Sequence, residues 1–207
     1  MEISWLPFKA QNNFWRLIDL NNLRVISGKA RGFRLKAVPG DSTRPITDRT
    51  KEALFNIIGT DIFEASLLDL FAGTGAVGIE ALSRGASFVR FNDQNRLAIE
   101  TIQANLKHTN LGDKSEILRL DAFNLLKQNP DRSFDYVYIA PPQYKNLWEK
   151  ALTELDSNSG WLAPGSWVIV QIDPKEYIYL NCTNFAEFDQ RKYGSTMLVF
   201  YEKNSID

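Results

Sequence analysis

The stretch LLDLFAGTGAVG, from Leu67 to Gly78, decides the fold, because an apolar run ends in the pattern Gly73-x-Gly75-x-x-Gly78. Such a pattern predicts a buried strand that turns sharply into a helix. Glycines at positions 73 and 75 remove the Cβ atoms that would keep a ligand from the backbone, and the following helix presents unpaired N–H groups. The stretch therefore predicts a nucleotide-binding loop, for either a dinucleotide or another adenosine-bearing cofactor.

Apolar runs alternate with amphipathic segments on both sides of this loop. The pattern predicts strands at residues 67–72, 88–92, 116–121, 134–140 and 166–172. It predicts helices at residues 47–58, 76–85, 96–108 and 145–155, the third of them closed by Gly112. Two last runs, 185–193 and 197–202, flank Gly194-Ser195-Thr196 and indicate an antiparallel hairpin. We therefore expect an α/β protein with a doubly wound, mostly parallel sheet that binds ligands at the carboxyl ends of its strands.

Length and composition are those of a single α/β domain with a small appendage. The chain has 207 residues, a net charge of −1, 44% hydrophobic residues and one cysteine, Cys182, which fits a cytoplasmic protein without disulfides. The sequence has no apolar run of the roughly 18 residues that a membrane span needs. We expect an N-terminal tail at 1–22, a basic β-rich segment at 23–46 and a catalytic domain at 47–204.

Residues 24–51 carry most of the local positive charge. Eight cations and two carboxylates give this segment a net charge of +6; the cations are Arg24, Lys29, Arg31, Arg34, Lys36, Arg44, Arg49 and Lys51. Glycines and prolines break the segment into short strands and turns, so the cations should lie on a surface. They are typical of phosphate contacts with nucleic acid, and a solvated basic face is the alternative.

Acidic and amide side chains stand where the predicted strands end. Asp93 lies at the offset from Gly73 at which an acid holds ribose hydroxyls in a dinucleotide site, so it does not identify the cofactor. Asp69, in contrast, indicates which cofactor binds. A carboxylate that leads into the loop would repel a pyrophosphate and favour the ammonium and sulfonium groups of S-adenosylmethionine. Asp121 would accept from the adenine amine and Ala122 N–H would face a ring nitrogen. Capping the loop or the next helix is the alternative role for Asp69 and Asp121.

The fourth strand ends in Ala140-Pro141-Pro142-Gln143-Tyr144, which indicates where the substrate binds. Two prolines fix the backbone and leave a rigid edge of carbonyl acceptors, and Tyr144 offers a ring for base stacking. An exocyclic amine that donates to fixed carbonyls is held in the pyramidal form that attacks a methyl group. A simple Pro-Pro turn is the alternative.

Taken together, these motifs resemble the RsmD family of 16S rRNA (guanine-N2)-methyltransferases. The resemblance rests on residues 24–32, 43–49, 52–56, the glycine loop, Ala140-Pro-Pro142 and residues 191–196, in the family's order. It implies a class I methyltransferase fold with an antiparallel last strand, S-adenosylmethionine and no metal, and the 16S rRNA of a small ribosomal subunit as partner of a monomeric enzyme. It also implies cofactor contacts at Asp69, Phe71, Gly73, Thr74, Gly75, Asn92, Asp93, Asp121, Ala122 and Ala140, and RNA contacts at Arg24, Lys29, Arg31, Arg34, Arg44 and Arg49.

The chain departs from the family pattern at two positions. The strand-four motif of the family begins with Asp, where this chain has Ala140, so Gln143 and the carbonyls of Ala140 and Pro141 are the acceptors that we expect. The family carries Glu at the end of the second strand, where Asn92 and Asp93 stand, and either could hold the ribose. Alternatives are a DNA adenine-N6 or other amino-group methyltransferase, a non-catalytic relative and an NAD-dependent oxidoreductase.

The family pattern begins only near Arg24, and Leu23 could be encoded by an alternative start codon. We therefore expect that residues 1–22 could be absent from the native protein.

Overall fold

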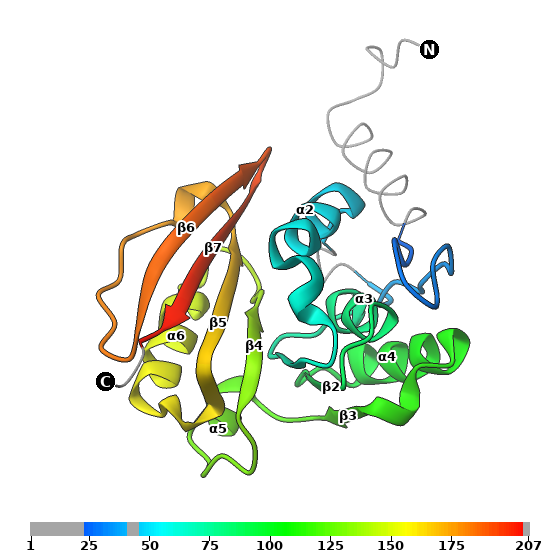
Figure 1. The fold of residues 1–207 in the computed structure, drawn as a ribbon, viewed down its shortest axis with the longest axis horizontal. Helices are drawn as coiled ribbons and strands as arrows, with labels where there is room; N and C mark the ends of the chain where they lie inside the picture. The colour runs from blue at the N-terminus through cyan, green and yellow to red at the C-terminus, as the bar shows by residue number, and fades with distance from the viewer. Residues whose placement is uncertain (1–22, 41–45, 205–207) are drawn as a thin grey trace.

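The computed structural model describes residues 23–40 and 46–204. Its centre is a seven-stranded sheet in the order β3-β2-β1-β4-β5-β7-β6 (Figure 1). The strands are β1 (Ser66–Asp69), β2 (Phe88–Asn92), β3 (Ser115–Leu118), β4 (Phe134–Ile139), β5 (Leu162–Ile172), β6 (Phe185–Tyr193) and β7 (Thr196–Lys203). β1 to β5 pair in parallel, and β7 is antiparallel to both β5 and β6. The predicted doubly wound sheet with an antiparallel last strand is confirmed.

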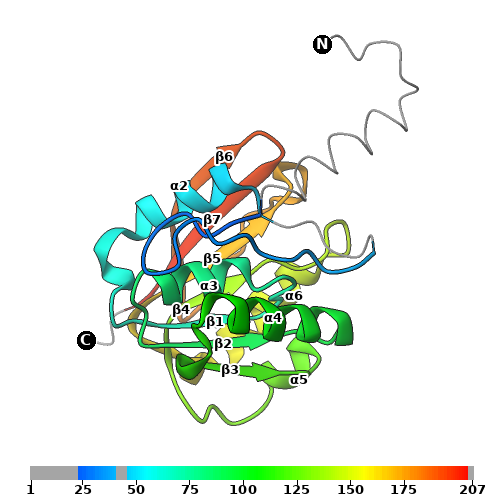
Figure 2. The same cartoon turned by 90° about the vertical axis from the view of Figure 1, so that its right-hand side faces the viewer.

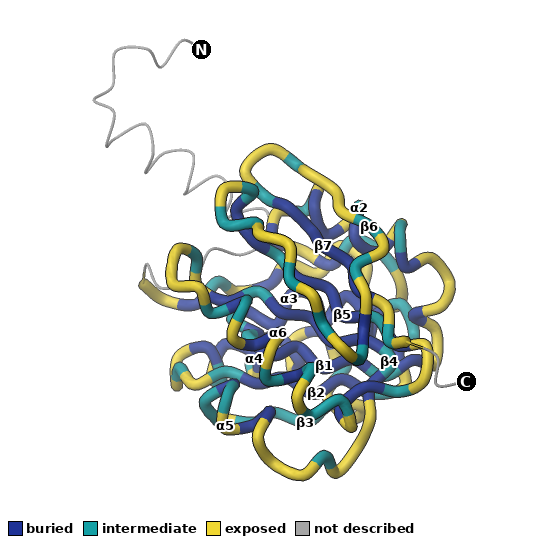
Figure 3. Tube along the Cα trace, turned by 90° about the vertical axis from the view of Figure 1, so that its left-hand side faces the viewer, coloured by how far each residue is buried: buried dark blue, intermediate teal, exposed yellow. Residues whose placement is uncertain are grey.

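Helices cover both faces of the sheet (Figure 2). One hydrophobic core joins it to α2 (Asp48–Ile58), α3 (Ala76–Ser83) and α4 (Arg96–Thr109). A second core, on the other face, joins it to α5 (Ala122–Leu126) and α6 (Leu147–Ser157). The central strands are accordingly buried along most of their length, as Figure 3 shows for β1 and β4, whereas the two edge strands, β3 and β6, are largely not buried. The strand order reverses between β1 and β4, which is where doubly wound sheets bind ligands.

Local sequence explains several element boundaries. Thr47 begins α2 by accepting a hydrogen bond from Thr50 N–H at 3.2 Å, as its position before the apolar stripe predicts. The end of α4 differs from the prediction, because Asn110 in the left-handed conformation caps it, and Gly112 begins the short 3-10 helix η2 (Gly112–Lys114) instead. A short polar side chain tolerates positive φ and supplies the helix stop two residues earlier than the glycine.

Strand ends also differ from the prediction. β1 ends at Asp69 and β3 at Leu118, each three residues earlier than expected, because the chain leaves the sheet there to line a cavity. β5 begins at Leu162, four residues earlier, through an irregular register with β4. Three further 3-10 helices, η1 (Gly59–Ile62), η3 (Ser159–Trp161) and η4 (Pro174–Glu176), complete the described elements.

The segment at 23–40 packs on the first core and does not form a separate layer. Leu23, Val25, Ala30 and Leu35 are buried in the same core as α3 and α4. Its pairing amounts to one antiparallel bridge, between Arg24 and Arg34, and the strands expected there do not extend further. The tail at 1–22 and Arg44 lie outside the described residues. Within the described residues, no helix is both long and apolar enough to cross a bilayer.

Candidate active site

A cavity of about 800 Å³ opens at the carboxyl ends of β1, β2 and β4. Of the residues that the sequence predicts for cofactor and substrate, the cavity is lined by Asp69, Phe71, Gly73, Thr74, Asn92, Asp93, Asp121, Ala122, Ala140, Pro141, Pro142 and Gln143. These residues come from four separate loops. The structure brings them together because parallel strands place their carboxyl ends at one edge of the sheet.

The glycine loop is held against the end of β2. Gly73 N–H donates to Asp93 Oδ2 at 2.9 Å. Gly75 begins α3 in the left-handed conformation, and a Cβ there would meet Ile102 and Phe91 at 3.3 Å. Gly75 does not line the cavity, so it serves the turn and the packing under it rather than access of a ligand to the backbone.

Asp69 is almost completely buried, with 2% of its surface exposed. Burial, opposed by the Gly78 backbone N–H and assisted by nearby Asp93, raises the pKa of its carboxyl from 3.8 to about 7. A buried carboxyl at the cavity wall is stabilised in its charged form by a cation and destabilised by an anion. This arrangement fits the ammonium and sulfonium groups of S-adenosylmethionine better than a pyrophosphate.

The structure assigns different surroundings to the two residues at the end of β2. Asn92 is fully buried, and its Nδ2 donates to the carbonyls of Leu70 and Leu120 at 3.1 and 3.2 Å. Asn92 thus ties together the loops after β1 and β3. Asp93 accepts from Gly73 and Asn95 N–H, one bond on each oxygen. A carboxylate has about four acceptor positions, so Asp93 retains capacity for two ribose hydroxyls.

Asp121 combines the two roles considered for it. Its Oδ1 accepts from the N–H groups of Phe123 and Asn124 at 3.1 and 3.0 Å, which makes it the N-cap of α5. Its Oδ2 makes no hydrogen bond to any described residue, and the side chain lines the cavity. The cap therefore fixes one oxygen while the other is open to an amino group.

The turn after β4 places some of its predicted residues in the cavity and one outside it. Ala140, Pro141, Pro142 and Gln143 line the cavity. Tyr144 does not: it has a φ of 60°, is 65% exposed, and its hydroxyl donates to Asp173 Oδ2 at 2.7 Å. That bond directs the ring toward η4, so Tyr144 does not lie in the cavity where we expected it to stack on a base.

Several lining side chains were not singled out from the sequence, among them Tyr138, Lys145, Gln171 and Thr196. Tyr138 donates its hydroxyl to Gln171 Oε1 at 2.6 Å, which joins β4 to β5 at the cavity wall. Lys145 supplies a cation beside the proline turn, and Thr196 reaches the cavity from the hairpin between β6 and β7. Tyr138 and Gln171 sit inside apolar runs that indicate only core strands, so their polarity gave no separate signal.

The basic segment is anchored to α3 through a buried carboxylate. Glu80 accepts from the N–H groups of Ile26 and Ser27 at 2.7 and 3.0 Å and lies 3.8 Å from Lys51 Nζ. Lys51 is fully buried, and burial lowers its pKa while Glu80 and Asp48 raise it. We counted Lys51 as a surface cation, and this is wrong: it belongs to the anchor, where Lys51 and Arg84, whose Nε lies 2.8 Å from Glu80 Oε1, offset the buried charge of Glu80.

Five predicted RNA-contacting cations are exposed: Arg24, Lys29, Arg31, Arg34 and Arg49. Arg24 Nε also donates to Asp48 Oδ2 at 3.0 Å.

Asn105 connects the basic segment to the glycine loop. It is fully buried on α4, and its Nδ2 donates to Thr74 O at 2.9 Å and to Lys36 O at 3.0 Å. Its Oδ1 accepts from Lys36 N–H at 2.7 Å. No sequence pattern indicates the role of Asn105, because an asparagine within a helix does not reveal partners 31 and 69 positions away.

The sequence model of a protein family described as conserved hypothetical protein 95 matches residues 23–202. The chain belongs to this family. Among its relatives, a Bacillus subtilis protein named "Putative rRNA methyltransferase YlbH" is 37% identical over 87% of this chain and 99% of its own length. The Haemophilus influenzae protein named ribosomal RNA small subunit methyltransferase D is 34% identical over 87% of this chain and 93% of its own. The resemblance to the RsmD family is thereby confirmed.

Solved structures agree with this family membership. An Escherichia coli protein described as "Putative methyltransferase yhhF" has a TM-score of 0.79 and 30% identity over 88% of this chain and 98% of its own. A Salinibacter ruber RNA methyltransferase in complex with S-adenosyl-L-homocysteine has a TM-score of 0.59 at 17% identity, over 77% of this chain and 94% of its own, and shares the fold.

Proposed function

We propose that this family member transfers a methyl group from S-adenosylmethionine to the exocyclic N2 of a guanine in small-subunit rRNA. The observation that carries this proposal is its membership of a family with relatives named ribosomal RNA small subunit methyltransferase D. The cavity at the switch point of the sheet supports it, because it combines a glycine loop, three carboxylates and a rigid turn of carbonyl acceptors. We expect the enzyme to act as a monomer in the cytoplasm.

The carboxylates would hold the cofactor, whose sulfonium supplies an activated methyl group. Asp69 would pair with its cationic end, Asp93 would accept from the ribose hydroxyls, and Asp121 Oδ2 would accept from the adenine amine. Each assignment uses an acceptor with remaining capacity at the cavity wall. Within the described residues no group of three or more histidine, cysteine or acidic side chains could hold a metal ion.

The turn after β4 would hold the guanine. Its N2 would donate its two N–H groups to two of the three acceptors in this turn, the Ala140 carbonyl, the Pro141 carbonyl and Gln143 Oε1, which favours the pyramidal nitrogen. N2 would then attack the methyl carbon in line with the departing sulfur and lose its proton to solvent. Orientation of two bound reactants can supply about 7–11 kcal/mol of the barrier reduction. With alanine at position 140, the reaction would depend on this positioning more than on a general base.

The exposed cations of residues 23–40 and Arg49 would contact RNA phosphates. Phe33 lies among them, is 41% exposed and meets His108 edge-on at 5.2 Å between ring centroids. An exposed aromatic ring beside arginines offers a platform for an unstacked base. The target guanine would leave its own stack to enter the cavity.

Ala140 favours one second candidate, a non-catalytic relative that binds the cofactor and RNA. Incubation with methyl-labelled S-adenosylmethionine and small subunits from a strain that lacks the enzyme separates the two. We expect label in 16S rRNA, recovered as N2-methylguanosine after digestion, and none with an Asp93→Ala variant that is folded. Absence of label with the wild-type protein refutes the proposal, and label in N6-methyladenosine would assign a different acceptor.

A further inference from the structure

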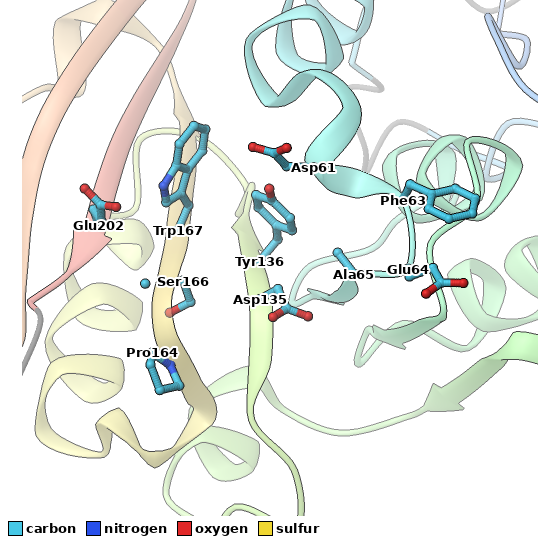
Figure 4. A pocket seen from close by; sticks show the side chains of 11 residues that line it. Asp61, Phe63, Glu64, Ala65, Asp135, Tyr136, Pro164, Ser166, Trp167 and Glu202 are labelled. Carbon is cyan, nitrogen blue, oxygen red and sulfur yellow. The ribbon is translucent and has the colours of Figure 1, made fainter.

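A second cleft, of about 520 Å³, lies at the opposite end of the strands from the candidate active site. It includes Ala65, just before β1, and Asp135, at the start of β4, whereas the active-site cavity lies at the carboxyl ends of the same strands. Figure 4 shows the cleft between η1 on one side and β5 and β7 on the other. The two cavities can therefore be occupied at the same time.

The floor of this cleft is aromatic. Tyr136 and Trp167 are neighbours on β4 and β5, with ring centroids 6.0 Å apart in an edge-on arrangement. The ring of Trp167 also contacts that of Phe188 on β6, with ring centroids 4.9 Å apart, and Phe188 is 45% exposed. Residues 173–184, between β5 and β6, contain only the short η4, so no helix follows β5 to cover these rings. Tyr136 itself is buried, whereas Trp167 and Phe188 are partly exposed and form an aromatic surface patch that points to a binding site.

The rim of the cleft is acidic. Its lining includes Asp61, Glu64, Asp135 and Glu202, and no lysine or arginine. Asp135 accepts from the N–H and hydroxyl of Ser66, both at 2.7 Å. The other three carboxylates make no hydrogen bond or ion pair with the described residues. Burial, together with the nearby charges of Asp61 and Asp135, raises the pKa of Tyr136 to about 12.

One polar group in the cleft wall is left unsatisfied. Ser166 is 3% exposed, and its Oγ is buried without a hydrogen-bond partner among the described residues. A buried hydroxyl without a partner costs free energy unless a ligand or water completes it. This independent observation indicates that the cleft is built to receive a hydrogen-bonding group.

The chemistry of the cleft selects its occupant. Carboxylates around aromatic rings repel phosphates and favour a planar cation that both stacks and donates, which describes a guanidinium better than an ammonium. A metal ion is a poor fit, because the described acidic residues form no group that could hold one. We propose that this cleft binds an arginine side chain of a basic protein partner, while the opposite end of the sheet acts on RNA.

The inference rests on the proposed function only in that such a protein would accompany the rRNA substrate. Binding itself is tested without any substrate, on the full chain by calorimetry with an acetylated hexapeptide of alternating glycine and arginine. A matched glycine–lysine hexapeptide is the control ligand. Asp61→Asn, Glu202→Gln and their combination test the cleft, and Asp113→Asn removes an exposed carboxylate elsewhere, on η2.

We expect saturable binding of the arginine peptide and at least threefold weaker binding of the lysine peptide. Each cleft substitution should lower the affinity for the arginine peptide by about two- to fivefold, as expected for the loss of an exposed ion pair. Asp113→Asn should leave this affinity unchanged. All three substituted residues are exposed, so the fold should persist, which circular dichroism verifies. No saturable binding, equal binding of both peptides, or an equal loss in Asp113→Asn would overturn the proposal. So would a dimer in sedimentation that Glu202→Gln dissociates, because a second copy would then occupy the cleft.

A second measurement compares methyl transfer to protein-free 16S rRNA and to assembled small subunits. The double cleft variant should lose activity several-fold on subunits and keep it on protein-free RNA. Equal activity of variant and wild type on subunits would also overturn the proposal. If the wild type methylates neither substrate, the proposed function fails, while the peptide titration still decides the role of the cleft.

Discussion

Replacement of Asp69 by asparagine should stabilise the ligand-free protein against unfolding at neutral pH. It should also weaken the binding of S-adenosylmethionine. The pKa of Asp69 rises from 3.8 to about 7 on folding, a difference of about 3 units, equivalent to about 4 kcal/mol. The folded state holds this proton more tightly than the unfolded chain. The contribution of this proton to the free energy of unfolding is therefore fully present below pH 3.8, decreases between pH 3.8 and 7, and is lost above pH 7. Asparagine has no such dependence.

Urea unfolding of both proteins without cofactor, at pH 4.5, 6 and 8, measures this difference. The free energy of unfolding of Asp69→Asn, relative to wild type, should rise by about 3–4 kcal/mol from pH 4.5 to pH 8. All other titrating groups are shared, so they cancel in the comparison. The exposed Asp113→Asn variant should show no such rise. The same relative stability at every pH would refute the assignment of a raised pKa to Asp69.

The cofactor should respond in the opposite sense. Because pairing with a cation requires ionised Asp69, wild-type affinity for S-adenosylmethionine should rise by nearly tenfold per pH unit from pH 5.5 to 6.5. It should then level off above 7. An α-amino group has a pKa near 7.7, so the cofactor's own ammonium does not titrate in that window. Titration calorimetry should show a flat, weaker profile for Asp69→Asn, and wild-type affinity in the variant at pH 7.5 would contradict the contact.

Three further outcomes are expected. Gln143→Ala should lower turnover at least tenfold with cofactor affinity within about twofold of wild type, whereas the exposed Gln103→Ala should change neither; unchanged turnover in Gln143→Ala removes it from the mechanism. Arg34→Ala should reduce the slope of log RNA affinity against log salt by about 0.7–0.9, and an equal change in Lys114→Ala would show that net charge alone matters. Asn105→Asp should lower the affinity for both the cofactor and RNA, because it places a carboxylate against the carbonyls of Thr74 and Lys36. Binding titrations in which the affinity for only one of the two ligands falls would contradict the bridging position of Asn105.

The pattern of the sequence predicted the sheet and most of the cavity. Alternation of apolar runs with amphipathic segments gives parallel strands, and their carboxyl ends meet at one edge whatever the details of packing. The glycine loop, Asp93, Asp121 and the Pro-Pro turn were therefore expected together from their positions alone. Cavity lining confirms that they converge, and their individual roles remain proposals.

Side-chain surroundings could not be predicted in the same way. The burial of Lys51 against Glu80, the bridging position of Asn105 and the turning of Tyr144 toward Asp173 all depend on partners 29 to 69 residues away. A local pattern records the type of residue and its spacing but not such partners. The same holds for the acidic cleft, whose lining comes from residues 61 to 202.

The sequence by itself determined the fold, the family and the position of the loop from Leu67 to Gly78. Only the tertiary structure decided the surroundings of each residue in and around that region. Gly75 faces the core, Asp93 accepts a hydrogen bond from the loop, and Asp69 is so buried that its pKa rises to about 7. The physical reason is that hydrophobic periodicity is a local property, whereas burial and electrostatic environment arise from segments that meet only after folding.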